Sequence, residues 1–258
     1  EIRSPKDFSS RSSVSPVVKG FFLGSQAGAV AMAPLETAKA KALLDRAIAA
    51  KGGLERLRAI KRLTAKTTTS MVGPDGRVQA EATTYLEYPN HVRVETTVRE
   101  LTSVQVYDGE RAWVRDSRGV QEVPERFIRD LQSSLRRDAI ALMLAAEQGQ
   151  VRARLLPDIK DDGGHVHQAL ELSGNDLEPV VLYIDPATGL ISKQTYVAGG
   201  AGQPLIEEIF GDYRPVDGVQ VAYTASMRRG GQPVLERKVT AMTINPPLDP
   251  ALFTRPAP

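Results

Sequence analysis

The chain has 258 residues, of which 41% are hydrophobic and 25% are charged. This is ordinary globular composition, and a chain of this length buries enough surface to fold without a disulfide or a structural metal. Lys and Arg total 33 against 31 Asp and Glu, a net charge of +2. Such a balance gives no general field for nucleic acid, so we expect no nucleic-acid partner. Cysteine is absent, which excludes disulfides, thiol catalysis and thiolate metal sites.

The N-terminal stretch differs from the rest of the chain. A basic, Ser- and Pro-rich start leads into an apolar stretch, Val17 to Ala33, in which Ala29 and Ala31 have the spacing of a signal cleavage site. Three interpretations stay open: a degenerate secretory signal, a linker after an upstream domain, or an arm packed on the body. No stretch reaches the roughly 18 to 20 apolar residues of a membrane span. The sequence predicts an extension over 1–34 and one domain over 35–258.

Two helical segments are expected. Apolar residues recur at helical spacing over about 35–50, where Gly52-Gly53 ends the pattern, and a short turn follows over 54–60. Farther along, an apolar stripe that includes Phe127, Leu131 and Leu135 predicts one long helix over about 125–147. Both helices are amphipathic, so we expect them to cover a sheet.

Elsewhere the period is two. From Lys61 to the end, apolar and polar residues alternate between turn motifs such as Gly73-Pro74-Asp75-Gly76 and Asp108-Gly109. This pattern predicts about ten to twelve strands in an antiparallel meander with one polar and one apolar face. No repeat of fixed period is present, which excludes a propeller or a solenoid.

A wide open antiparallel sheet rarely stays flat, so the sheet must curl. The predicted fold class is mainly β (α+β): a curled antiparallel sheet that forms an unclosed half-barrel covered by helices. The inward-facing sets mix small residues with Val and Leu, which leaves room for an apolar ligand. We expect the ligand-binding residues to be Ala80, Ala82, Leu86, Val92, Val94, Val104, Val106, Leu131, Leu135, Leu182 and Val221.

Three stretches carry a family resemblance: 183–191 with Asp185-Pro186, 210–219 with Asp217-Gly218, and 239–253. Together, in this order, they resemble the outer-membrane lipoprotein carrier superfamily, the LolA-like and RseB-like periplasmic half-barrels. The resemblance covers about residues 35–258. It implies an unclosed barrel with a helical lid, an apolar cavity for acyl chains, a lipid or acylated protein as partner, and a place in the periplasm or cell envelope.

A second resemblance lies at Ala50 to Leu57, which is similar to the start of such domains appended to insulinase-type zinc peptidases. It implies an accessory C-terminal module of a larger peptidase-like envelope protein, with an envelope protein as partner. The peptidase motif H-x-x-E-H is absent from this sequence, so no protease activity follows.

Catalytic patterns are sparse. His165 and His167 fall on one face of a strand near Asp158, Asp161 and Asp162, and two imidazoles with a carboxylate can hold zinc. This leaves a metal-dependent hydrolase as a third hypothesis. The sequence has no nucleophile elbow and no phosphate-binding loop. The sparse catalytic motifs predict a noncatalytic protein with no cofactor, and the resemblance to the carrier superfamily implies an envelope protein that binds an apolar ligand.

Overall fold

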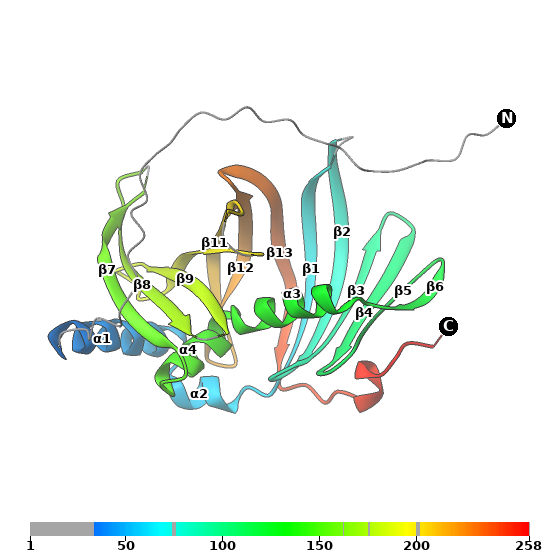
Figure 1. Cartoon of the computed structure of the whole chain (residues 1–258), viewed down its shortest axis with the longest axis horizontal. Helices are drawn as coiled ribbons and strands as arrows, with labels where there is room; N and C mark the ends of the chain where they lie inside the picture. The colour runs from blue at the N-terminus through cyan, green and yellow to red at the C-terminus, as the bar shows by residue number, and fades with distance from the viewer. Residues whose placement is uncertain (1–33, 74–75, 162, 175, 200–201, 258) are drawn as a thin grey trace. The chain divides into compact units, whose positions relative to one another are not determined.

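The computed structural model describes residues 34–73, 76–161, 163–174, 176–199 and 202–257 (Figure 1). The interpretations of residues 1–33 lie outside the described residues. The helices are α1 (Pro34–Lys51), α2 (Leu54–Ala59), α3 (Glu125–Arg136), α4 (Ala139–Glu147) and a short 3-10 helix, η1 (Pro250–Phe253). The strands are β1 (Arg62–Gly73), β2 (Gly76–Glu87), β3 (His91–Val98), β4 (Leu101–Asp108), β5 (Ala112–Asp116), β6 (Gly119–Glu122), β7 (Arg152–Lys160), β8 (Val166–Gly174), β9 (Leu177–Ile184), β10 (Ile191–Val197), β11 (Leu205–Val216), β12 (Val219–Arg229) and β13 (Gln232–Ile244).

All strands belong to one sheet. In the described part of the chain it has 13 strands in the order β6-β5-β4-β3-β2-β1-β13-β12-β11-β10-β9-β8-β7. Every neighbouring pair is antiparallel, and the pairing of β1 with β13 joins the two halves of the sequence. The ends of the sheet, β6 and β7, do not pair with each other. The predicted fold class, a curled antiparallel sheet left unclosed and covered by helices, is confirmed.

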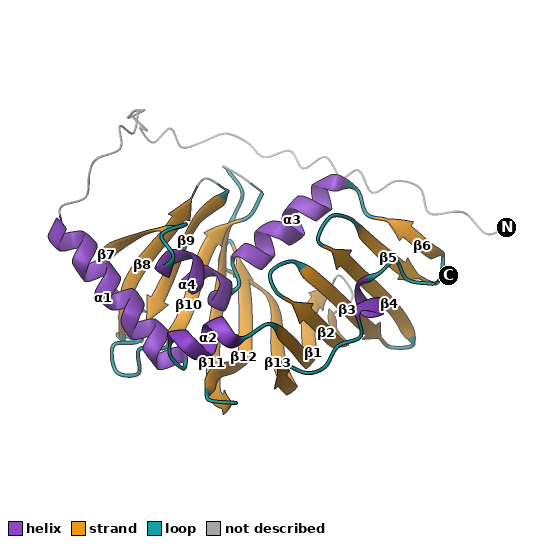
Figure 2. Ribbon diagram, turned by 90° about the horizontal axis from the view of Figure 1, so that it is seen from below, coloured by secondary structure: helices purple, strands orange, loops and turns teal. Residues whose placement is uncertain are grey.

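Helices α1 to α4 lie on one side of the sheet, which we call the inner face (Figure 2). There α1, α2 and α4 pack on β7 to β10. Side chains such as Leu44, Leu142 and Leu170 are almost completely buried in this cluster. Gly52, at φ 138°, ends α1 as predicted. A Cβ at that position would lie 2.6 Å from the carbonyl oxygen of Gly218, so the close approach to the β11–β12 turn requires glycine.

A second buried cluster lies under α3. Leu86, Val92, Tyr107 and Ala112 form its sheet side, and Ile128, Leu131 and Leu135 of α3 pack against them. Helix α3 thus packs on the inner face against a cluster whose residues come from β1 to β5. Phe127 was expected in the same apolar stripe, but its side chain is 48% exposed and lies beside the guanidinium of Arg126.

The single long helix predicted over 125–147 is wrong, because the chain breaks into α3 and α4 at Arg137 and Asp138. The Asp138 carboxylate accepts hydrogen bonds from the backbone N–H groups of Ile140 and Ala141, each at 3.1 Å. It therefore caps the start of α4. Its Oδ1 atom also accepts a hydrogen bond from the Tyr88 hydroxyl at 2.9 Å. The apolar spacing continues through the break, which is why periodicity alone predicted one helix.

Candidate functional site

Strand register arranges the inner face in rows that run across the sheet. The row beneath α3 runs from Ile244 through Leu63, Leu86 and Val92 to Tyr107. The following rows contain small side chains. One row places Ala65 beside Thr84 and Val94, the next places Thr67 beside Ala82 and Thr96, and another places Thr69 beside Ala80.

Most of the predicted ligand-binding residues share this face. Ala80, Ala82, Leu86, Val92 and Val94 come from the adjacent strands β2 and β3. Leu131 and Leu135 of α3 pack against Leu86 and Val92. The structure therefore places seven of the expected residues on this face or against it, and their role in binding stays a prediction.

Leu182 and Val221 belong to the other buried cluster of the inner face. Leu182 is completely buried beneath the helices, at 0% exposure, and acts as a core residue in this arrangement. Val221 is partly buried against the same cluster. Neither residue is in the cluster that α3 covers.

The expectation that Val104 and Val106 line the inner face is wrong. Val92 pairs with Tyr107 across β3 and β4, so even-numbered residues of β3 share a face with odd-numbered residues of β4. Val104 and Val106 consequently point to the opposite, outer face. There they form a small buried cluster with Trp113.

One further row of the inner face was not predicted from the sequence. Met227 pairs with Leu235, Leu235 with Met71, and Met71 with Val78, so the four side chains follow one another across β12, β13, β1 and β2. We call them the apolar row. All four are half-buried, and none belongs to the buried clusters of the described chain. The β1–β13 pairing that unites them joins positions far apart in the sequence, so no local motif could reveal it.

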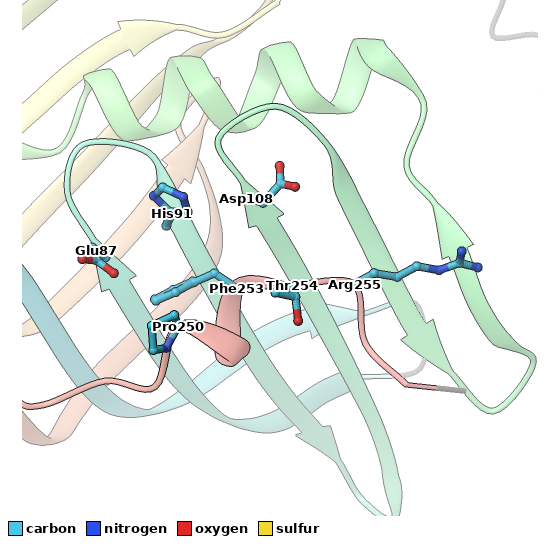
Figure 3. A pocket seen from close by; sticks show the side chains of 7 residues that line it. All are labelled: Glu87, His91, Asp108, Pro250, Phe253, Thr254 and Arg255. Atoms are coloured by element: carbon cyan, nitrogen blue, oxygen red, sulfur yellow. The ribbon is translucent and has the colours of Figure 1, made fainter.

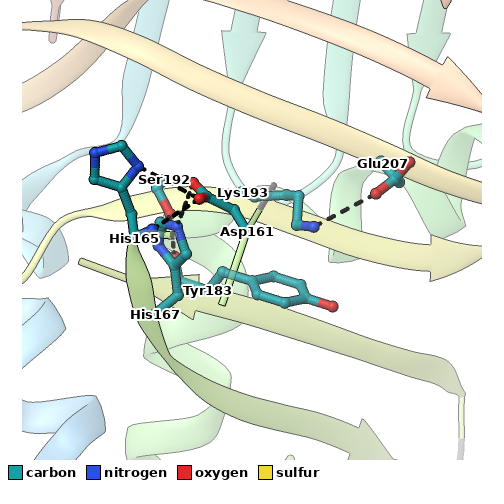
Figure 4. Close-up of polar contacts among 7 residues, drawn as sticks. All are labelled: Asp161, His165, His167, Tyr183, Ser192, Lys193 and Glu207. Atoms are coloured by element: carbon teal, nitrogen blue, oxygen red, sulfur yellow. Dashed lines mark hydrogen bonds and ion pairs between the residues drawn. The ribbon is translucent and has the colours of Figure 1, made fainter. Parts of the chain in front are cut away.

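A polar cluster lies on the outer face over β8, β10 and the β7–β8 turn (Figure 4). Asp161 accepts from His167 through Oδ2 at 3.2 Å and faces His165 through Oδ1 at 3.3 Å. The hydrogen bond from His167, followed by that from the His165 backbone, lowers the pKa of Asp161 to about 2. Within the described residues no group of three or more His, Cys, Asp or Glu could hold a metal ion.

The same cluster has the residue types of a hydrolytic triad. Ser192 Oγ lies 2.9 Å from His167 Nδ1, and His167 Nε2 faces Asp161. The serine hydroxyl, however, donates to the carbonyl oxygen of Tyr183 at 3.1 Å. With the serine proton directed at that carbonyl, a hydrogen bond between Ser192 and His167 requires Nδ1 to donate to the serine oxygen. A nitrogen that donates in this way cannot accept the serine proton. The arrangement is that of a structural network.

The C-terminal segment forms a pocket of about 270 Å³ on the outer face (Figure 3). It arises where η1 packs on β3 and β4. Arg93 Nη1 donates to the Leu252 carbonyl at 3.2 Å, and the rings of His91 and Phe253 meet edge to face at 5.6 Å. The lining of the pocket is charged as well as apolar and comprises Glu87, His91, Asp108, Pro250, Phe253, Thr254 and Arg255. Such a lining does not suit a long apolar chain.

The helices that the structure describes include none with the length and apolar character needed to cross a membrane. The sequence matches no known family model and no curated protein.

The fold is similar to those of several solved structures. A DUF1329 family protein from Desulfovibrio piger superposes with a TM-score of 0.58 at 12% identity, over 83% of this chain and 97% of that one. A LolA superfamily protein from Nitrosomonas europaea superposes with a TM-score of 0.56 at 16% identity, over 83% of this chain and 97% of that one. A putative outer membrane lipoprotein-sorting protein domain from Vibrio parahaemolyticus superposes with a TM-score of 0.52 at 13% identity, over 83% of this chain and 97% of that one. The chain therefore has the fold of the LolA-like proteins, as the resemblance in its turn motifs implied.

Proposed function

We propose that this chain is a noncatalytic protein of the cell envelope whose inner sheet face binds the acyl chain of a lipid or of an acylated protein. The apolar row is the observation that carries the proposal. Met227, Leu235, Met71 and Val78 present a continuous apolar strip across four strands. Strands lie about 4.8 Å apart, so the strip extends for roughly 15 Å.

The neighbouring rows support a chain-shaped ligand. Thr67, Thr69 and Ala82 are small and only partly buried, so an apolar chain could lie close to the backbone beside the apolar row. Each methylene that leaves water contributes about 0.8 kcal/mol before the cost of ordering the chain. Helix α3 borders the same face, where its side chains already pack on the row beneath it.

The envelope location and the domain limits belong to the same proposal. The fold likeness to the LolA superfamily protein and to the lipoprotein-sorting protein domain supports an envelope role. We assign the binding domain to residues 35–258, which contain all 13 described strands.

Titration with an environment-sensitive acyl probe tests this function. We expect saturable binding that Met227→Glu and Leu235→Glu weaken strongly, because a carboxylate in the row would have to lose its hydration. Thr243→Glu on β13 is the control, since Thr243 is exposed and lies outside the row. Failure of the probe to bind in a saturable way would contradict the proposal and favour an accessory module of a larger envelope protein.

A further inference from the structure

We infer that a polar pair at one end of the apolar row, Gln194 and Glu208, binds an uncharged ligand head that carries hydrogen-bond donors, such as a hydroxyl or amide head. The inference rests on the proposed function, because it places the head of the same ligand whose chain lies on the apolar row. Glu208 pairs with Met227, the first member of that row, and Gln194 pairs with Glu208 on its other side. The polar pair and the apolar row therefore form one line across six strands.

The Glu208 carboxylate is held in place by two donors. Its Oε2 atom accepts from Gln194 Nε2 at 2.7 Å, and its Oε1 atom accepts from the Tyr196 hydroxyl at 2.8 Å. Burial, and then the charge of Glu208, raise the pKa of Tyr196, so its hydroxyl remains a donor over the ordinary pH range. Glu208 itself is half-buried, and a carboxylate oxygen has more acceptor positions than these bonds use.

Gln194 adds an acceptor that has no partner. Its residue exposure is only 5%, and its Oε1 atom is the buried side-chain atom of the described residues that lacks a hydrogen bond. Turning the amide over would place this oxygen against the Glu208 carboxylate, where two acceptors would face each other. The orientation is therefore fixed by Glu208. A buried acceptor without a donor costs about 1–3 kcal/mol, which a donor from a bound molecule would recover.

The charges around Gln194 and Glu208 determine which ligand head group is favoured. No described cation forms an ion pair with Glu208. The guanidinium of Arg137, at the end of α3, lies over the Tyr196 ring at 4.3 Å. Glu208 and the Gln194 oxygen are acceptors, so they attract hydroxyl or amide N–H groups and repel a carboxylate. Arg137 and Arg237 are the nearby cations that could favour a carboxylate instead. Arg237 lies one row away beside Ala225 and is exposed to solvent.

The test compares two ligands that share one saturated chain: a monoacylglycerol and the free fatty acid. The affinity of each ligand is measured by its displacement of the acyl probe from the full chain, at neutral pH and below the concentration at which the ligand aggregates. We expect the monoacylglycerol to bind about tenfold more tightly, since a hydrogen bond to a charged group corresponds to roughly that factor. The same comparison with Glu208→Gln should reduce the preference to about twofold or less. Gln194→Met should lower the affinity for the monoacylglycerol and leave the affinity for the fatty acid almost unchanged.

Glu207 provides the matched control on the same strand. It faces Lys193 at 3.4 Å on the outer face (Figure 4), so Glu207→Gln should leave the preference intact. Equal binding of the two ligands, or a preference for the fatty acid, would overturn the inference while the proposed function stands. Binding of neither ligand would overturn both. The wild-type comparison decides the question even if a variant fails to fold.

Discussion

Replacing Asp138 by Ala should show how far the α3–α4 junction holds the inner face together. The substitution removes the cap of α4, which contributes about 1 kcal/mol. It also leaves the half-buried Tyr88 hydroxyl without its acceptor, at a further cost of about 1–2 kcal/mol. We expect the free energy of unfolding to fall by about 2–3 kcal/mol, which lowers the melting temperature by roughly 4–12 °C in a domain of this size.

Chemical denaturation of Asp138→Ala and three further variants separates the two contributions. Asp138→Asn should cost much less than Asp138→Ala, because asparagine also caps helices and accepts a hydrogen bond. Tyr88→Phe removes only the hydroxyl, and its effect combined with Asp138→Ala should be smaller than the sum of the two. A loss below about 0.5 kcal/mol for Asp138→Ala, or strictly additive effects, would refute this account of the junction.

Three further predictions concern other parts of the fold. Leu131→Asp should cost several kcal/mol in urea denaturation, whereas Phe127→Asp should cost less than about 1 kcal/mol, because only Leu131 packs on the sheet; similar losses would show that α3 does not pack as described. The pKa of Asp161 is about 2 in the folded chain, below its ordinary 3.8, so its contribution is present above about pH 4 and is lost as the pH falls toward 2; His167→Gln should flatten the dependence of stability on pH in this window, and an unchanged slope would contradict the assignment. Val106→Ala should destabilise the fold by about 1–3 kcal/mol without changing acyl-probe affinity, because Val106 is buried on the outer face; weaker probe binding by a folded variant would place it in the site after all.

Local patterns predicted most of the fold. Alternation of apolar and polar residues and the glycine turns indicated an open antiparallel sheet, and the stripe through Leu131 and Leu135 indicated a covering helix. The break at Asp138 was not predictable from that stripe, because the spacing of apolar residues persists across it. What decides the break is a side-chain cap and a contact with Tyr88, 50 positions earlier in the chain.

The candidate site was predictable only in part, because its geometry depends on register. A hairpin pairs Val92 with Tyr107, and this single alignment sends Val104 and Val106 to the outer face. The pairing of Met71 with Leu235 belongs to the contact between β1 and β13, which joins the two halves of the sequence. Alternation within one strand cannot report which residues of a distant strand share its row.

The most direct test of the central claim is the affinity of the full chain for saturated monoacylglycerols of increasing length, measured by displacement of the acyl probe at two salt concentrations. If the apolar row binds the chain, affinity should rise with each added methylene until the face is filled, by up to about 0.8 kcal/mol each. Added salt should change the affinity little, because the contact is apolar. Affinity that is independent of chain length, or binding that disappears in salt, would contradict the claim.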